Sequence, residues 1–197
     1  METIALEDGG LVYYQEGFLK TEQADRYFHD IREGCCWEQK PGLFGYPQPR
    51  LIASYGDDGV SYKYSGRNYV ALPWTQPLLE IKSRIEEVCG EYNYCLLNRY
   101  RDGSDSMGWH ADAEPEMGPI IGSVTLGATR KFRIRHNATR KIMSFQLGHG
   151  ALMIMAGTMQ EFWQHEVPKT KRPVGERINL TYRSIHHPTT GEHAGSR

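Results

Sequence analysis

Two histidines and one aspartate are spaced so that they could bind a metal ion. His110 and Asp112 stand two residues apart, and on a strand such residues point to the same side of the sheet. His165, further along the chain, is the best candidate for a third ligand. Two histidines and one carboxylate on one face of a divalent metal are the ligand set of non-haem Fe(II) oxygenases. Ordinary polar strand residues would show the same spacing, so the triplet alone leaves the chemistry open.

A row of polar side chains shares one face of a predicted strand near the C-terminus: Arg177, Asn179, Thr181 and Arg183. An exposed polar sheet face would give the same pattern. Guanidinium groups also bind carboxylates in a bidentate way, and 2-oxoglutarate, which donates two electrons to Fe(II) oxygenases, has a carboxylate at each end. Six residues of strand span about 20 Å at roughly 3.3 Å each. One arginine is therefore expected at the distal carboxylate and the other near the metal.

An amide and a phenol form a third pair with the same spacing. Asn98 and Tyr100 stand at i and i+2, shortly before the histidine and the aspartate. Both side chains can donate hydrogen bonds to a co-substrate. By itself this pair indicates no function; it supports one only in combination with the predicted metal ligands and the row of polar side chains.

These side chains need a scaffold of strands, and the second half of the chain has the pattern for one. From about Tyr94 onward apolar and polar residues alternate, and β-branched and aromatic residues are frequent, as is typical of strands. The predicted strands are 94–100, 120–126, 130–135, 142–147, 151–155, 162–167 and 177–184. Short strands separated by Gly, Asn and Pro indicate a sandwich, barrel or jelly roll.

Two amphipathic helices are predicted before these strands, so the fold class is α+β. The first follows Thr21 as its N-cap and carries one apolar face, made of Ala24, Tyr27, Phe28 and Ile31. The second begins at Thr75 and stops near Gly90, and its apolar stripe consists of Leu78, Ile81, Ile85 and Val88. Residues 40–74, rich in Gly, Pro and Tyr, are expected to form irregular hairpins.

The composition indicates one folded domain. The chain has 197 residues, of which 39% are hydrophobic and 24% charged, and this excludes the disordered and membrane-spanning classes. The N-terminal sequence METIALEDGG lacks the basic segment of a signal peptide. The four cysteines form no CxxC pair and are read as reduced thiols. We therefore expect a monomer in the cytoplasm, or in the nucleus of a eukaryote, without a membrane partner.

The net charge of -1 hides a separation of charge along the chain. No acid lies between Glu116 and Glu161, a stretch that includes a predicted strand with Arg130, Arg133 and Arg135. A second basic loop follows, with Lys169, Lys171 and Arg172. Such stripes bind phosphate backbones through counterion release, although a solvated charged sheet face is the alternative. These six residues are the candidate contacts with a nucleic-acid backbone.

Taken together, the motifs resemble the AlkB family of Fe(II)- and 2-oxoglutarate-dependent dioxygenases, which repair alkylated nucleobases. The resemblance holds over about residues 40–185. Its motifs are Asn98-x-Tyr100, Gly108-Trp109-His110-x-Asp112-x-Glu114, Ser123-x-x-Leu126-Gly127, His165 and Arg177-x-Asn179-x-Thr181-x-Arg183. Upstream, Pro49-Arg50 and Tyr62-x-Tyr64 look like the nucleotide-recognition segments of members that act on double-stranded DNA. Ala113 stands where the family often has a second acid, which puts a base-edge contact from that position in doubt.

The resemblance implies a fold, a domain layout and a ligand set. The fold would be a double-stranded β-helix, or jelly roll, with N-terminal helices packed on one sheet. One domain would span 1–186, with a nucleotide-recognition lid at about 40–74, a catalytic core at about 94–184 and a flexible tail at 187–197. Fe(II) would be held by His110, Asp112 and His165. 2-Oxoglutarate would be held by Asn98, Tyr100, Arg177, Asn179, Thr181 and Arg183, with Arg177 at the distal carboxylate and Arg183 beside Asp112.

The implied reaction is oxidative demethylation of N1-methyladenine and N3-methylcytosine in DNA, with RNA left open as a second substrate. It consumes O₂, converts 2-oxoglutarate to succinate and releases formaldehyde. A base in a duplex must leave the stack to react. By resemblance, Tyr64 and His110 would flank that base, and Tyr62 and Glu114 would reach its edge. A hairpin tip would wedge into the gap that the base leaves, and the remaining substrate contacts would come from Leu43, Phe44, Gly45 and Arg50, the last of these to a phosphate or to the orphaned partner base.

Three other functions fit parts of the pattern. A 2-oxoglutarate-dependent hydroxylase or demethylase acting on protein or RNA would use the same metal site, but a protein substrate leaves the basic stripe and Tyr62 and Tyr64 unexplained. A zinc hydrolase could use the same three metal ligands with a bound water, but leaves Arg177 and Arg183 without a role. A non-catalytic nucleic-acid-binding module would not need an intact ligand set.

Overall fold

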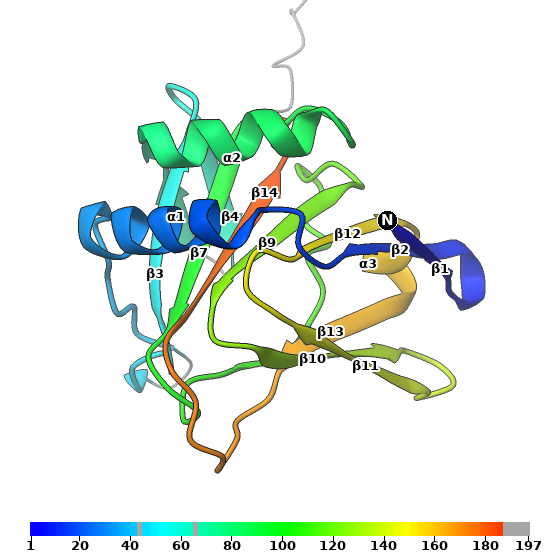
Figure 1. The fold of residues 1–197 in the computed structure, drawn as a ribbon. Helices are drawn as coiled ribbons and strands as arrows, with labels where there is room; N and C mark the ends of the chain where they lie inside the picture. The colour runs from blue at the N-terminus through cyan, green and yellow to red at the C-terminus, as the bar shows by residue number, and fades with distance from the viewer. Residues whose placement is uncertain (43–44, 65–66, 187–197) are drawn as a thin grey trace, which may run out of the picture.

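The computed structural model describes residues 1–42, 45–64 and 67–186, with the side chains of residues 62–69 excepted. Two antiparallel sheets face each other and form a sandwich (Figure 1). The larger sheet consists of β1 (Glu2–Ala5), β2 (Gly10–Gln15), β12 (Leu152–Gly157), β9 (Ile121–Gly127), β14 (Arg177–Arg183), β7 (Tyr94–Tyr100), β3 (Leu51–Gly56) and β6 (Leu72–Pro73), in that order. Among the described strands, only the short β6 pairs in parallel, with β3.

The smaller sheet has the order β11 (Ile142–Leu147), β10 (Arg130–His136), β13 (Trp163–Val167) and β8 (Met107–His110). A separate hairpin consists of β4 (Ser61–Tyr64) and β5 (Arg67–Val70). A buried apolar cluster lies between the larger and the smaller sheet. It includes Ile121 and Met153 from the larger sheet and Phe132, Ile134 and Trp163 from the smaller one. This cluster occupies one part of the interior, and the polar pocket described below occupies another.

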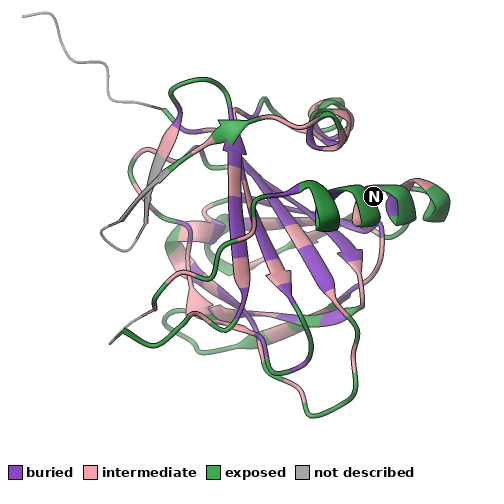
Figure 2. Ribbon diagram, turned by 90° about the vertical axis from the view of Figure 1, so that its left-hand side faces the viewer, coloured by how far each residue is buried: buried purple, intermediate pink, exposed green. Residues whose placement is uncertain are grey.

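Two helices cover the outer face of the larger sheet. Their buried side chains, Ala24 and Ile31 of α1 (Thr21–Gly34) and Leu78 and Ile81 of α2 (Gln76–Glu86), join one apolar cluster with strand residues such as Leu180. Figure 2 shows that the long strands of this sheet are mostly buried, whereas each helix turns an exposed side to solvent. The helices thus bury one face of the larger sheet, and the pocket lies on its opposite face.

The element boundaries differ from the predictions in a few places. Thr21 is the first residue of α1, and Lys20 takes the N-cap position. Val88 was expected in the apolar stripe of the second helix, but α2 ends at Glu86 and Val88 is exposed. A short helix, α3 (Met159–Phe162), occupies the start of the strand predicted at 162–167. The N-terminal strands β1 and β2 and the strand β3 had no counterpart in the predicted set.

Gly127 makes the tight turn between β9 and β10, and we expect its replacement by alanine to be strongly destabilising. Its φ is +84°, and an added Cβ would lie 2.4 Å from the carbonyl oxygen of Glu176. Strain of this kind costs about 1–3 kcal/mol for the backbone alone, and the backbone clash adds to it. Gly17 is the matched control, since its φ is +64° but nothing lies within 4 Å of an added Cβ. Urea unfolding should show a larger loss of unfolding free energy for Gly127→Ala than for Gly17→Ala; equal losses would contradict the role of the clash.

Candidate active site

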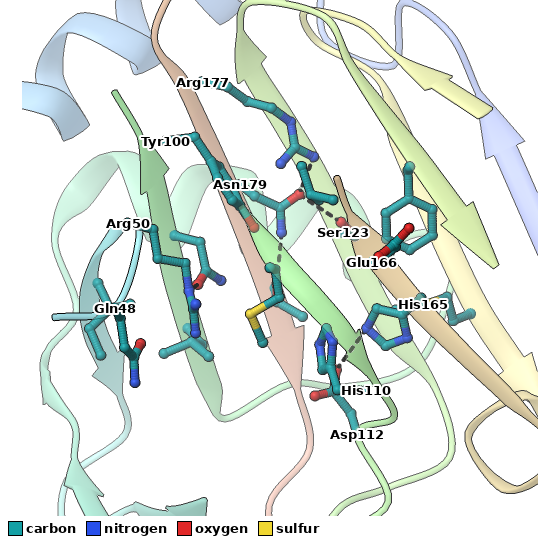
Figure 3. Close-up of a pocket in the computed structure, with 18 of the residues that line it drawn as sticks. Gln48, Arg50, Tyr100, His110, Asp112, Ser123, His165, Glu166, Arg177 and Asn179 are labelled. Atoms are coloured by element: carbon teal, nitrogen blue, oxygen red, sulfur yellow. Dashed lines mark hydrogen bonds and ion pairs between the residues drawn. The ribbon is translucent and has the colours of Figure 1, made fainter. Parts of the chain in front are cut away.

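The residues predicted to bind the metal and 2-oxoglutarate line one pocket between the two sheets (Figure 3). Three neighbouring strands of the larger sheet supply its floor, because the register of β14 places Arg177 opposite Tyr100 of β7 and Asn179 opposite both Asn98 of β7 and Thr125 of β9. The smaller sheet supplies the facing wall through His110 and His165, which are register partners on β8 and β13. Residues far apart in the sequence are thereby brought to one cavity.

The three predicted metal ligands meet at one end of this pocket. The ligand atoms of His110, Asp112 and His165 all lie within 4.8 Å of one another. The imidazole rings of the two histidines are 4.1 Å apart between centroids, and His165 Nε2 lies 3.8 Å from Asp112 Oδ2. The expectation that both members of the His-x-Asp pair lie on a strand is wrong: His110 ends β8, and Asp112 follows in the adjoining loop. The loop still brings the carboxylate to the imidazoles.

Neighbouring groups fix the orientation of these ligands. The carbonyl of Gly108 lies 2.8 Å from His110 Nδ1; because a carbonyl can only accept, Nδ1 carries the proton and Nε2 keeps its lone pair. The ring of Phe132 stacks on His165 at 5.4 Å. The backbone N–H of Asp112 donates to the side chain of Gln160, in α3, at 3.0 Å. Partners of this kind hold metal ligands in their binding geometry.

The protonation states of the three ligands suit a divalent cation. Burial, together with the neighbouring His110, lowers the pKa of His165 to about 3, and burial also lowers the pKa of His110. Burial acts to raise the pKa of the Asp112 carboxyl, but Arg183, His165 and His110 together outweigh it, and that pKa lies below its ordinary value. Near neutral pH the site therefore offers two neutral imidazoles and one carboxylate, the forms that bind metals.

Arg183 lies at the metal end of β14, where the length of the strand had placed one of the two arginines. Its guanidinium donates to Asp112 Oδ2 at 2.8 Å, and both side chains are buried. The pair compensates the charge of both groups inside the protein, since a buried carboxylate without a partner would be strongly unfavourable. One side of the Asp112 carboxylate is thus engaged by Arg183.

Arg177 lies at the other end of the polar row and has hydrogen-bonding capacity to spare. One of its nitrogens, Nη2, donates to Thr125 Oγ1 at 2.9 Å and to Asn179 Oδ1 at 2.7 Å. The other two, Nε and Nη1, are buried without a hydrogen-bond partner among the described residues. Burial lowers the pKa of Arg177 to about 10, so the side chain stays charged at neutral pH. A buried guanidinium with two unused donors fits a carboxylate ligand.

A chain of hydrogen bonds leads from Arg177 through Asn179 to Thr181 along the floor of the pocket. Asn179 Nδ2 donates to Thr181 Oγ1 at 2.9 Å, and Ser123 Oγ donates to Asn179 Oδ1 at 3.1 Å. Sequence reasoning assigned no role to Ser123 or Thr125, although both stand at i and i+2 on a predicted strand, the same signal that was used for Asn98 and Tyr100. Gln160 carried no comparable signal.

The predicted substrate contacts are only partly described. Arg50 is buried in the pocket wall and donates to Asn98 Oδ1 at 2.7 Å; its contact with a phosphate or with the orphaned base stays a prediction. Glu114 is half-buried, close behind Asp112 in the chain. Pro41 and Pro47 form an antiparallel bridge on either side of the predicted hairpin tip, and Gly45 is exposed. The side chains of Tyr62 and Tyr64, and all of Leu43, Phe44 and the tail 187–197, lie outside the described residues.

One of the six predicted backbone contacts is overturned. Arg130 is 2% exposed and has no surface to offer a phosphate, because it shares its face of β10 with Phe132 and Ile134 rather than with Arg133 and Arg135. Arg133 forms an ion pair with Glu166, and Arg135 donates to Gln164 at 2.7 Å. The loop cations are exposed in the segment between β13 and β14: Lys169, Lys171 and Arg172. For these five residues the nucleic-acid contact stays a prediction.

Comparison with known proteins identifies the family to which this site belongs. The family model described as "2OG-Fe(II) oxygenase superfamily" matches residues 10–183. The bovine protein "Alpha-ketoglutarate-dependent dioxygenase alkB homolog 3" is 38% identical over 193 residues, which cover 90% of this chain and 67% of that protein. The mouse "DNA oxidative demethylase ALKBH2" is 36% identical over 180 residues, covering 83% of this chain and 75% of that protein. The chain spans 62% of the length of the rat alkB homolog 3.

Solved structures support the same fold. The structure titled "The structure of OsALKBH1" superposes with a TM-score of 0.61 at 19% identity, over 88% of this chain and 97% of that one. A prolyl hydroxylase from Trichoplax adhaerens also gives 0.61, at 11% identity, over 88% and 83% of the two chains. At such identities the likeness concerns the fold alone.

The chain belongs to the 2OG-Fe(II) oxygenase superfamily, as a homologue of its AlkB-type dioxygenases. Enzymes of this family use Fe(II), 2-oxoglutarate and O₂, and the predicted enzyme class and cofactors are thereby confirmed. The His-Asp-His cluster and the buried, partly unpaired Arg177 fit the metal and the co-substrate. None of the described helices has the length and apolar character that crossing a membrane requires.

Proposed function

We propose that this protein removes methyl groups from N1-methyladenine and N3-methylcytosine in DNA, with RNA as a second substrate to be tested. The observation that carries the proposal is a single buried pocket in which His110, Asp112 and His165 stand at one end and Arg177 at the other. The names of its homologues, an alkB homolog and a DNA oxidative demethylase, support a nucleic-acid substrate. We further propose one domain over residues 1–186, with residues 40–74 as its lid.

The roles of the residues follow from their positions. His110, Asp112 and His165 would hold Fe(II), which, together with 2-oxoglutarate and O₂, would supply the oxidation of the methyl group. Arg177, with its unused Nε and Nη1, would hold the distal carboxylate of 2-oxoglutarate. The other residues predicted to bind 2-oxoglutarate would orient it between that arginine and the metal: Asn98, Tyr100, Asn179, Thr181 and Arg183. Succinate and formaldehyde would be the small products.

The substrate base would enter between the lid and the metal. Arg50, bonded to Asn98, lines the pocket together with Gln48 and would meet a base there. We propose that Tyr62, Tyr64 and Glu114 bind the flipped base and that the hairpin tip with Leu43, Phe44 and Gly45 separates it from its neighbours. Each of these roles remains to be tested by substitution.

One assay tests the proposed function. The protein is incubated with Fe(II), ascorbate, 2-oxoglutarate and oligonucleotides that carry N1-methyladenine or N3-methylcytosine, and succinate, formaldehyde and the repaired base are quantified. We expect one formaldehyde for each base repaired. Matched unmethylated oligonucleotides serve as the control. Succinate formation without repair of any methylated DNA or RNA would reject the nucleobase substrate and favour the alternative of a protein hydroxylase.

The exposed cations of the loop between β13 and β14 are expected to contribute to nucleic-acid affinity. Changing Lys169, Lys171 and Arg172 to Glu together should weaken binding and reduce the slope of log K against log [salt] by about 0.7–0.9 for each phosphate that the variant no longer neutralises. The measurement is fluorescence anisotropy of a labelled oligonucleotide at several salt concentrations. Lys20→Glu is the control, because this exposed residue precedes α1 on the helix-covered side. An unchanged salt slope in the triple variant would remove this loop from the interface.

A further inference from the structure

Arg130 is a buried cation that the proposed mechanism does not use. It extends from β10 of the smaller sheet into the interior and is 2% exposed. Its guanidinium donates to three backbone carbonyls, those of Asp102, Asp105 and Pro168, each at 2.9 Å. The carboxylate of Asp105 is meanwhile engaged by Arg101, through its backbone N–H at 2.9 Å and its side chain at 2.8 and 2.9 Å. The hydrogen bonds of Arg130 thus go to neutral acceptors, and no carboxylate among the described residues pairs directly with its charge.

The ring of Tyr100 lies close to the guanidinium groups of both Arg130 and Arg177. The guanidinium carbon of Arg130 is 5.6 Å from the ring centroid, and that of Arg177 is 5.3 Å from the same centroid. Arg177 reaches the ring from β14, the strand next to Tyr100 in the larger sheet, whereas Arg130 reaches it from the facing sheet. Both distances are within the range of cation–π attraction. One aromatic ring therefore connects a buried cation of the smaller sheet to the arginine at the end of the pocket.

We propose that Arg130 is a positioning residue for the co-substrate, which fixes the ring of Tyr100 and adds a second positive charge at the Arg177 end of the pocket. The inference rests on the proposed function, in which Arg177 holds the distal carboxylate of 2-oxoglutarate. Arg130 does not line the pocket, so it acts through the ring and through its field rather than by contact. The dicarboxylate is thereby favoured over 2-oxo acids that lack the second carboxylate.

The electrostatics of the two arginines support this role. Burial lowers the pKa of Arg177 to about 10, and the charge of Arg130 contributes to that lowering. Burial also lowers the pKa of Arg130, against the opposing effects of Tyr100 and Asp105. Two cations that disfavour each other in a buried space are relieved when an anion enters between or beside them. The distal carboxylate is the part of the co-substrate that would provide this relief.

Arg130 also has a structural role, and the experiment has to separate the two. Its bonds join the turn after β7 to the loop that leads from β13 to β14, and these two segments also meet through Thr170 N–H, which donates to the Gly103 carbonyl at 2.8 Å. A purely structural role predicts equal damage to the binding of any 2-oxo acid. A positioning role predicts damage only where the distal carboxylate is present.

The test uses the Mn(II)-loaded protein and two probes of equal chain length, 2-oxoglutarate and 2-oxopentanoate, measured by calorimetric titration. We expect Arg130→Met to weaken 2-oxoglutarate binding about tenfold, in the range of a desolvated cation–π contact, and to change 2-oxopentanoate binding less than about twofold. Equal weakening of both probes, or of neither, would overturn the inference. If the wild-type protein does not prefer 2-oxoglutarate, the distal-carboxylate site of the proposed function fails, and this inference fails with it.

A milder variant keeps the test decisive if Arg130→Met does not fold. Arg130→Lys retains the charge but not the planar group with its three bonds, and we expect it to weaken 2-oxoglutarate binding by about two- to fivefold. In a Tyr100→Leu background, Arg130→Lys should change 2-oxoglutarate affinity by less than about twofold, because the aromatic ring through which Arg130 acts is absent. An undiminished effect of Arg130→Lys in that background would overturn the role of the ring.

Discussion

His165→Ala is expected to abolish metal binding and, with it, all turnover of 2-oxoglutarate. The imidazole is one of three ligands within 4.8 Å of one another, and removing only a hydrogen-bond partner of a metal ligand typically costs about 10–100-fold in metal affinity. We therefore expect the affinity for Mn(II), as a stand-in for Fe(II), to fall by more than about 100-fold. Calorimetric titration with the metal and quantification of succinate would measure the two effects.

His29→Ala is the matched control for this loss. His29 is exposed on α1 and contacts the neighbouring Asp30. It lies on the helix-covered face of the larger sheet, which is the face away from the pocket. Its replacement should leave metal affinity and turnover at wild-type levels. Circular dichroism of both variants would show whether the fold is retained. A folded His165→Ala protein that still binds the metal with wild-type affinity would remove His165 from the metal site.

Arg177→Met is expected to raise the KM for 2-oxoglutarate by at least about 100-fold while leaving metal affinity within about twofold. Two buried donors, Nε and Nη1, have no partner among the described residues, and each hydrogen bond to a charged group contributes about 1.5–3 kcal/mol. Losing both corresponds to roughly 3–6 kcal/mol of binding. Steady-state kinetics at varied 2-oxoglutarate, with a separate metal titration, would resolve the two quantities.

Arg99→Met gives the comparison for this second variant. Arg99 stands on β7 between Asn98 and Tyr100, but its side chain points away from the pocket and pairs with Glu176 at 2.8 Å. Removing that partly exposed pair should cost no more than about 1 kcal/mol of stability and should not change the KM. If the two variants shifted the KM equally, the effect would reflect damage to the sheet, and the carboxylate site would have to be sought elsewhere.

The central strands could be predicted from sequence because apolar and polar residues alternate regularly over the whole length of each strand. The bounds of β7 and β11 agree with the predicted 94–100 and 142–147, and β9, β10, β12 and β14 differ from prediction by a residue or two. β2 was missed although its partner on one side is the neighbouring β1; its partner on the other side is the distant β12, where Tyr13 faces Ile154. A pairing partner so distant gives no local signal. Thr21 and Val88 were misplaced for the ordinary reason that helix ends depend on a few competing contacts.

The residues that form the site were easier to predict than the solvent exposure of the arginines around it. The i, i+2 rule brought Arg177 and Asn179 to one face, and the sheet register then placed Asn98 beside them. The same rule, applied to β10, would have put Arg130 on the face of Phe132 and Ile134, but its charge led to the wrong expectation of a surface contact. The ion pair of Arg133 with Glu166 likewise depends on the neighbouring strand β13, which no spacing within β10 could indicate.

The bond between Asp112 and Arg183 has a consequence for how the fold and the metal depend on each other. His110 and His165 belong to the smaller sheet, whereas Asp112 is held by an arginine of the larger one, so an ion bound by all three ligands acts as a cross-link between the two layers. Thermodynamic linkage then makes resistance to unfolding a function of free metal concentration. At 100 times its dissociation constant, a cation that binds only the native state adds about 2.7 kcal/mol. Iron limitation would thus affect the persistence of the folded protein as well as its turnover.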